Sequence, residues 1–133
     1  MKIFVTGVSG FLGSHMAARL LTHGHTVMGT LRRAGMASLE SKRRLKTLET
    51  LGSASNKLQI ARADEYEGLY NTLQKFRPEI CIHLAGKSWI RESIDHPDLY
   101  QEANHHYTAS LLEALHQNGC RRVIFASSVM IYG

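Results

Sequence analysis

The sequence predicts an α/β fold, a doubly wound parallel sheet that is covered by helices on both faces. Short apolar segments alternate with amphipathic segments of helical period along the chain, and strands that are joined through helices pair in parallel. A glycine-rich turn joins the first apolar segment to the first helical one, which is typical of folds that bind dinucleotides. With 133 residues the chain is expected to form one domain.

Five strands are expected where apolar or β-branched residues lie between turn signals. In chain order they span residues 2–6, 25–31, 58–61, 79–84 and 122–126. Because crossover connections are right-handed, the expected strand order is 3-2-1-4-5. A ligand crevice is then expected where the order reverses, beyond the carboxyl ends of the first and fourth strands.

Four helices are expected from apolar residues that recur every three or four positions. They span residues 12–22, 38–51, 65–76 and 97–117, and the last begins at Pro97, a favourable first helical residue. The residues expected on their buried faces are Leu12, Met16, Ala17, Leu20 and Leu21, then Leu45, Leu48 and Leu51, then Leu69, Leu73 and Phe76, and finally Leu99, Ala103, Tyr107, Leu111 and Leu115.

Composition narrows the function classes. The chain is 44% hydrophobic and 20% charged, which is ordinary for a globular protein, and no apolar run is long enough to cross a membrane. The net charge is +5, and residues 32–46 form a basic stretch without interleaved aromatic residues, which favours a solvated helix face over a nucleic-acid site. Cys81 and Cys120 are expected to be reduced core residues, which, with no signal peptide evident, favours a cytoplasmic protein.

Three glycines at a spacing of three, Gly7, Gly10 and Gly13, follow the first expected strand and lead into the first helix. Free N–H groups and the dipole at a helix start favour an anion such as a pyrophosphate. In this interpretation Gly7 allows the sharp turn, Gly10 lets the ligand approach the backbone, and Gly13 lets the helix lie close to its strand. The alternative is a plain turn followed by a packing glycine.

Two arginines, Arg32 and Arg33, follow the second expected strand, where dinucleotide folds often carry an acidic residue for the adenosine ribose. The planar guanidinium group suits a 2′-phosphate because it stays charged and bonds phosphate oxygens in pairs. The two residues therefore favour NADP over NAD. The alternative is a pair of ordinary surface arginines.

The segments after the fourth and fifth strands complete the expected site. Leu84, Ala85 and Gly86 follow the fourth strand, and the two small residues let the backbone approach a ribose on the nicotinamide side. Ser127 and Ser128 follow the fifth and can hydrogen-bond a substrate alcohol or carbonyl. A generic strand-to-loop transition and a polar turn are the respective alternatives. The histidines show no spacing that would hold a metal, and none is expected.

These segments together resemble the N-terminal part of the extended short-chain dehydrogenases/reductases, and more narrowly the nucleotide-sugar epimerases and dehydratases. The resemblance extends over essentially all 133 residues and implies a Rossmann-type NAD(P)-binding domain over residues 1–133, with the C-terminal part of the family fold absent. The matching segments are residues 6–15, Asp64, 83–86, 91–93, Asn104 and 125–133.

The resemblance implies cofactor contacts at the matching positions. The backbone at Phe11 and Leu12 is expected to contact the pyrophosphate, and Asp64 to bond the adenine. Residues 84–86 are expected to line the ribose and nicotinamide, and Asn104 to steady the local backbone.

The same resemblance implies a hydride-transfer reaction and shows that one catalytic motif of the family is missing from this chain. Ser128 is expected to orient the reacting oxygen of a sugar while hydride passes transiently between a ring carbon and NADP, and residues 31–33 are closest to the GDP-mannose 4,6-dehydratase-like branch. The family's general acid/base is the tyrosine of a Tyr-x-x-x-Lys motif, which this chain lacks. We therefore expect the NADP-binding portion of a nucleotide-sugar epimerase or 4,6-dehydratase, inactive on its own.

Two other functions are consistent with the residues. A non-catalytic NADP-binding module needs no Tyr-x-x-x-Lys, and an RNA-binding protein would use the basic stretch at 32–46, which is the weakest of the three interpretations. The expected partner is a nucleotide-sugar substrate, and binding to nucleic acid or to a membrane is not expected. Residues 97–117 are the candidate helix for a homodimer.

Overall fold

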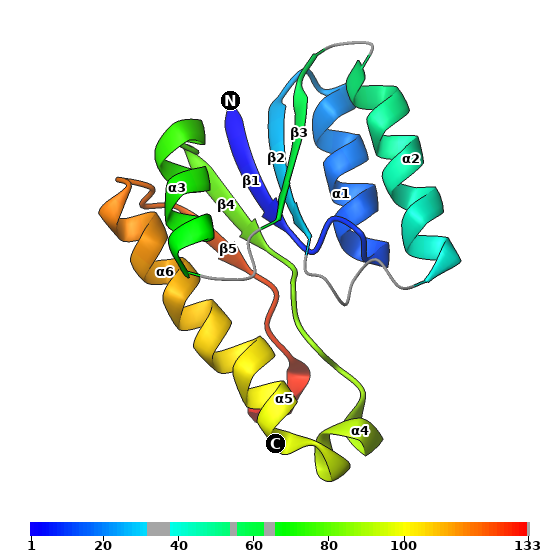
Figure 1. Cartoon of the computed structure of the whole chain (residues 1–133), viewed down its shortest axis with the longest axis vertical. Helices are drawn as coiled ribbons and strands as arrows, with labels where there is room; N and C mark the ends of the chain where they lie inside the picture. The colour runs from blue at the N-terminus through cyan, green and yellow to red at the C-terminus, as the bar shows by residue number, and fades with distance from the viewer. Residues whose placement is uncertain (32–37, 54–55, 63–65, 133) are drawn as a thin grey trace.

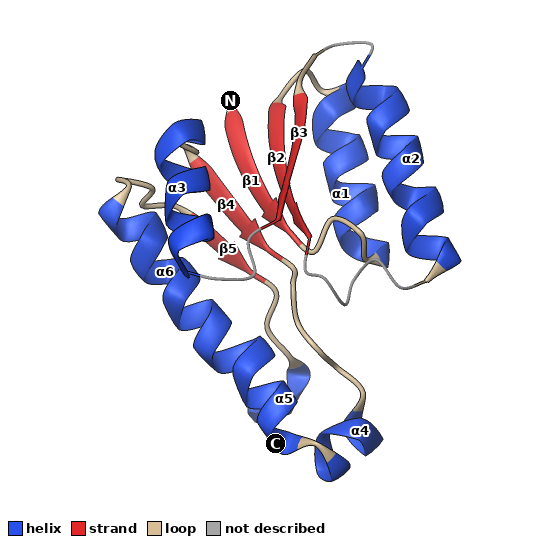
Figure 2. Ribbon diagram, viewed as in Figure 1, coloured by secondary structure: helices blue, strands red, loops and turns tan. Residues whose placement is uncertain are grey.

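The computed structural model describes residues 1–31, 38–53, 56–62 and 66–132. A five-stranded sheet has the order β3-β2-β1-β4-β5, and every pairing is parallel (Figure 1, Figure 2). The strands are β1 Lys2–Thr6, β2 Thr26–Leu31, β3 Leu58–Arg62, β4 Ile80–His83 and β5 Val123–Phe125. The expected strand order is thereby confirmed.

The register brings the ends of three strands to one edge of the sheet. Thr6, the last residue of β1, pairs with Thr30 of β2 and with His83 of β4. β1 and β2 are almost continuously buried, as expected for parallel strands that are covered on both faces. The loops that follow these strands therefore leave the sheet close together.

Helices cover the two faces in pairs. α1, Phe11–Thr22, and α2, Leu39–Ser53, lie on one face, while α3, Tyr66–Phe76, and α6, Tyr107–Gln117, lie on the other (Figure 1). Each pair closes an apolar core against the sheet. The buried residues of the first core are Ile3, Val5, Val8, Ala17, Leu21, Val27, Leu31, Leu45, Leu48 and Ile82, and those of the second are Phe4, Met28, Leu69, Leu73, Phe76, Cys81, Leu111, Ala114, Leu115 and Cys120.

The helix expected over residues 97–117 is interrupted. α5, Pro97–Gln101, is joined to α6 by a π-helical turn, Glu102–His106. Asn104 lies in that turn and makes side-chain hydrogen bonds to the backbone of Lys87, and π-turns of this kind are frequent at functional sites. An apolar pattern alone does not distinguish such a turn from regular α-helix.

Two short elements were not expected, α4 at Ile90–Asp95 and a 3₁₀ helix at Val129–Tyr132; both are too short for a periodic pattern to show. Three leucines expected on buried faces are instead exposed: Leu12 by 54%, Leu51 by 38% and Leu99 by 46%. Leu12 and Leu51 lie in the terminal turns of α1 and α2, and Leu99 lies in α5, which extends past the sheet (Figure 1).

Both cysteines are buried, and each is a free thiol. Burial raises the pKa of the Cys81 thiol, and the neighbouring Cys120 adds to the effect, so Cys81 stays protonated near neutral pH. In the part of the chain that the structure describes, no helix has the length and apolarity that crossing a bilayer requires.

Candidate functional site

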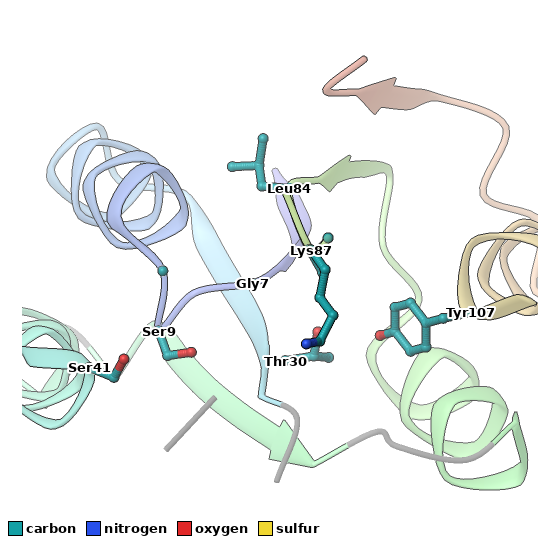
Figure 3. A pocket seen from close by; sticks show the side chains of 10 residues that line it. Gly7, Ser9, Thr30, Ser41, Leu84, Lys87 and Tyr107 are labelled. Atoms are coloured by element: carbon teal, nitrogen blue, oxygen red, sulfur yellow. The ribbon is translucent and has the colours of Figure 1, made fainter. Parts of the chain in front are cut away.

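A cavity of about 400 Å³ opens at the edge where β1, β2 and β4 end. It brings the glycine turn after β1 together with the loop after β4, two segments that are far apart in the sequence (Figure 3). The lining residues are Gly7, Ser9, Gly10, Thr30, Ser41, Leu84, Ala85, Gly86, Lys87 and Tyr107. The structure thus gathers five of the positions singled out from the sequence: Gly7, Gly10, Leu84, Ala85 and Gly86.

The glycine turn leaves the start of α1 open to a ligand. Gly7 has a φ of 75°, a left-handed conformation that favours glycine, and the Gly10 N–H donates to Gly7 O at 2.9 Å. Gly10 is the N-cap of α1, and no side chain caps the helix. N–H groups of the first turn are therefore available to an anion, which the helix dipole also attracts.

Gly13 makes its close contact at a different place from the one expected. A Cβ at Gly13 would overlap Gly7 O and would lie 2.7 Å from Gly7 C and 3.1 Å from Val8 Cα. The start of α1 therefore packs on the turn itself, beyond the end of β1. A Cβ at Gly7 would in turn lie 3.0 Å from Ala85 N, so the turn and the loop after β4 meet backbone to backbone.

Two buried hydroxyl groups in the cavity were missed by the sequence analysis. Ser9 is 7% exposed and Thr30 is 3% exposed, and both line the cavity (Figure 3). Neither side chain is hydrogen-bonded to another residue in the part of the chain that the structure describes. Both are therefore available to hydrogen-bond a ligand. Their positions could have found them, because Ser9 lies within the glycine turn and Thr30 lies near the carboxyl end of the second predicted strand.

A second cavity, of about 640 Å³, continues the first toward β5 and shares residues 84–87 with it. Its walls include Phe125, Ser127 and Ser128. Ser128 is exposed, and its Oγ accepts a hydrogen bond from the N–H of Met130 at 3.2 Å. The hydroxyl hydrogen of Ser128 is thus still free to donate.

The loop after β4 is held at its far end by a side-chain amide. Asn104 Oδ1 accepts from Lys87 N at 2.7 Å, and Asn104 Nδ2 donates to Lys87 O at 2.8 Å. The Lys87 ammonium donates to Glu92 Oε2 at 2.9 Å, and the Tyr100 hydroxyl donates to the same oxygen at 2.6 Å. These bonds, first Tyr100 and then Lys87, hold the pKa of the Glu92 carboxyl below its usual range.

Other predicted site residues are less confined. Phe11 is 68% exposed, and its ring lies 4.6 Å from the His15 ring between centroids. Arg32, Arg33 and Asp64 lie outside the described residues. Within the described ranges, no three histidine, cysteine, aspartate or glutamate side chains are grouped so that they could hold a metal ion.

A comparison of the whole chain with known protein families gives an assignment that is consistent with the site geometry. Residues 3–133 match the NAD dependent epimerase/dehydratase family. The chain belongs to this family. The family match confirms the resemblance drawn from the glycine turn and the segments after β4 and β5.

Similar proteins include Protein CapI of Staphylococcus aureus, 32% identical over all of this chain and 39% of that protein. A UDP-glucose 4-epimerase of Mycolicibacterium smegmatis is 36% identical over 96% of this chain and 39% of its own length. The solved UDP-glucose 4-epimerase of Thermus thermophilus, in complex with NAD, superposes with a TM-score of 0.78 at 28% identity, over 96% of this chain and 38% of that one. The chain spans less than two fifths of the length of each of these proteins.

A further likeness concerns the fold alone. The UDP-Glc/GlcNAc 4-epimerase of Campylobacter jejuni superposes with a TM-score of 0.85 at 24% identity, over 99% of this chain and 38% of that structure. The sheet and its helices therefore have the same fold as the matched part of that structure.

Proposed function

We propose that the chain is the cofactor-binding portion of a nucleotide-sugar epimerase that uses NADP, with 4,6-dehydration as the alternative reaction. The observation that carries the proposal is the cavity in which the uncapped start of α1 faces the loop after β4. An anion site and a closely approachable backbone on one sheet edge are what a dinucleotide requires. Relatives named as UDP-glucose 4-epimerases support UDP-sugars as the first substrate class to test.

Each part of the site acts on a different part of the ligand. The N–H groups at Phe11 and Leu12, in the first turn of α1, donate to the pyrophosphate. The Ser9 and Thr30 hydroxyls hydrogen-bond the ribose hydroxyls that enter the cavity. The small residues of the 84–86 segment let the nicotinamide side lie against the backbone. When bound, the cofactor supplies a transient hydride acceptor for a sugar ring carbon.

Ser128 orients a sugar hydroxyl but does not ionise it. Its oxygen already accepts from Met130 N, so its hydrogen is the group left to bond a sugar oxygen in the second cavity. A serine hydroxyl is too weak an acid to serve as a base near neutral pH without help, and the chain has no Tyr-x-x-x-Lys. We therefore expect the 133 residues to bind cofactor without turning over a nucleotide sugar.

The cofactor preference is tested by titrating NADP and NAD against the protein and against Arg32→Ala/Arg33→Ala. Charge-assisted hydrogen bonds to phosphate contribute about 1.5–3 kcal/mol each, so NADP should bind more than about tenfold more tightly than NAD. The double variant should lose this preference. Lys42→Ala/Arg43→Ala is the matched control, because it removes the same charge from two exposed positions on α2.

The outcomes of this titration separate two claims. An equal or tighter affinity for NAD in the unmodified protein removes the NADP preference but leaves cofactor binding intact. Gly10→Val adds a branched side chain at the start of α1 and should abolish binding of both cofactors with little loss of folding. Normal binding by Gly10→Val would place the phosphate site elsewhere.

A second candidate is a non-catalytic NADP-binding module, which needs no Tyr-x-x-x-Lys. The intact mass of the native protein distinguishes the two functions. A native protein that continues into a Tyr-x-x-x-Lys motif is the enzyme, and one that ends at residue 133 is the module.

A further inference from the structure

His83, at the end of β4, is 1% exposed and is held from two sides. On one side its Nδ1 lies 2.6 Å from the Oγ1 of Thr6, its register partner in β1. On the other side its Nε2 lies 2.9 Å from the Oγ1 of Thr108 in α6. The rings of Tyr107 and Phe125 lie beside the imidazole, with centroids at 6.1 and 5.3 Å. Two strands and a helix are thus connected through one side chain.

Counting hydrogen bonds at Thr6 assigns the proton positions. Thr6 Oγ1 accepts from Leu84 N at 3.1 Å and from Ala85 N at 3.0 Å, and a hydroxyl has two acceptor sites and one hydrogen. That hydrogen therefore goes to His83 Nδ1. The imidazole is then neutral and carries its own hydrogen on Nε2, from which it donates to Thr108.

We propose that His83 is a positioning residue for the loop after β4. Thr108 holds the imidazole as the Nε2–H tautomer, and this tautomer lets the Thr6 hydroxyl accept hydrogen bonds from both N–H groups at the start of the loop. With the hydrogen on Nδ1 instead, Thr6 would face three N–H donors with two lone pairs. One of the two loop N–H groups would then be released. α6 therefore controls, through the imidazole, how firmly this loop is held.

The inference rests on the proposed cofactor-binding function, because the position of this loop sets one wall of the cavity. The loop touches the glycine turn with no side chain between them, since a Cβ at Gly7 would lie 3.0 Å from Ala85 N. Asn104 holds the other end of the loop at Lys87. Loss of the Thr6 anchor would lower the fraction of molecules with the loop in place, and apparent affinity falls with that fraction.

Thr108→Val is the decisive variant, because Thr108 is hydrogen-bonded to the His83 imidazole and can affect the Thr6 bonds to the loop only through it. Valine keeps the shape of the half-buried threonine and removes its hydroxyl. Thr108→Ser restores the hydroxyl, and Thr6→Val removes the acceptor itself. Cys81→Ala is the matched control, because it shortens a buried side chain of the same strand and leaves the network intact.

The first measurement uses the cofactor-free protein. The ¹⁵N shifts of the His83 imidazole should report the Nε2–H tautomer in the unmodified protein, Thr108→Ser and Cys81→Ala, and a mixture of tautomers in Thr108→Val. Hydrogen exchange of the Leu84 and Ala85 amides, relative to other β4 amides, should quicken about tenfold in Thr6→Val and about threefold in Thr108→Val. Thr108→Ser should restore the slow exchange.

The second measurement is NADP affinity, which should fall by about the same factors in the two valine variants. An unchanged tautomer and unchanged exchange in Thr108→Val would overturn the inference. An equal loss of affinity in Cys81→Ala would also overturn it, because the effect would then follow stability. If the unmodified protein binds neither NADP nor NAD, the proposed function fails, while the tautomer and exchange data still decide whether α6 controls the loop.

Discussion

β1 and β5 are strands of the same sheet and contain the same kind of residue, yet they differ in burial. Residues 3–6 of β1 are all buried, whereas Val123, Ile124 and Phe125 of β5 are 36%, 57% and 54% exposed. β1 lies in the centre of the sheet, while β5 is one of its two edge strands (Figure 1). A hydrophobic sequence is therefore not sufficient for burial. The neighbouring strands and the helices that pack on the sheet decide whether a strand is buried.

The two ends of the candidate site, the glycine turn and the surroundings of Ser128, differ in burial in the same way. The glycine turn is packed closely against α1 and against the loop after β4. In the second cavity, which Ser128 lines, the apolar side chains are largely exposed: Ile90, Phe125, Met130 and Ile131. Exposed apolar groups of this extent are unusual on a monomer surface. The described residues thus form a well-packed end at the glycine turn and leave the end around Ser128 uncovered.

The largest expected effect tests the packing at the glycine turn. Gly13→Ala should lower the free energy of unfolding by about 3 kcal/mol, because its Cβ would overlap Gly7 O and the turn would have to move. Denaturant unfolding measures this change. Gly68→Ala, in α3, is the control: among the described residues its Cβ would meet only Arg62 O, at 3.9 Å, so alanine should raise stability by about 0.5 kcal/mol. A neutral Gly13→Ala would show that the turn is loosely packed.

A matched pair of valines tests the contrast between the two strands directly. Val5→Ala in β1 should cost about 2 kcal/mol, because a fully buried side chain loses two methyl groups and leaves a cavity. Val123→Ala in β5 should cost less than about 1 kcal/mol, because the side chain is 36% exposed. Equal costs for the two variants, measured by thermal or denaturant unfolding, would mean that β5 is covered in solution.

The smallest effect concerns the half-buried ion pair between Lys87 and Glu92, beyond the loop. Tyr100→Phe removes the first cause of the lowered Glu92 pKa, so the titration midpoint of Glu92 should rise toward the usual range. Because the folded pKa lies below the unfolded one, the pair's contribution to stability is present above the unfolded pKa and is lost as the pH falls through the folded one. A carboxyl NMR titration measures the midpoint. Tyr66→Phe, which removes a hydrogen bond to Gln117, should leave Glu92 unchanged.

How far the site could be predicted depended on whether its parts were local. The glycine turn is one continuous segment, and its position after β1 followed from the strand and helix patterns around it. The 84–86 segment could be placed opposite it because parallel strands end at one edge. The bonds that join Thr6 to this loop could not be foreseen, because they depend on sheet register. For Asn104 the family resemblance implied a role in steadying the local backbone, but its partner, Lys87, depends on the π-turn.

By itself the sequence determined the α/β class, the strand order and the two segments that line the first cavity, because hydrophobic period and connection handedness leave few topologies. Only the tertiary structure decided that Ser9 and Thr30 face the cavity, that Gly13 packs on the turn, and that β5 stays exposed. It also decided that the His83 imidazole lies between the hydroxyl groups of Thr6 and Thr108, because β1 and α6 approach β4 only in the folded chain.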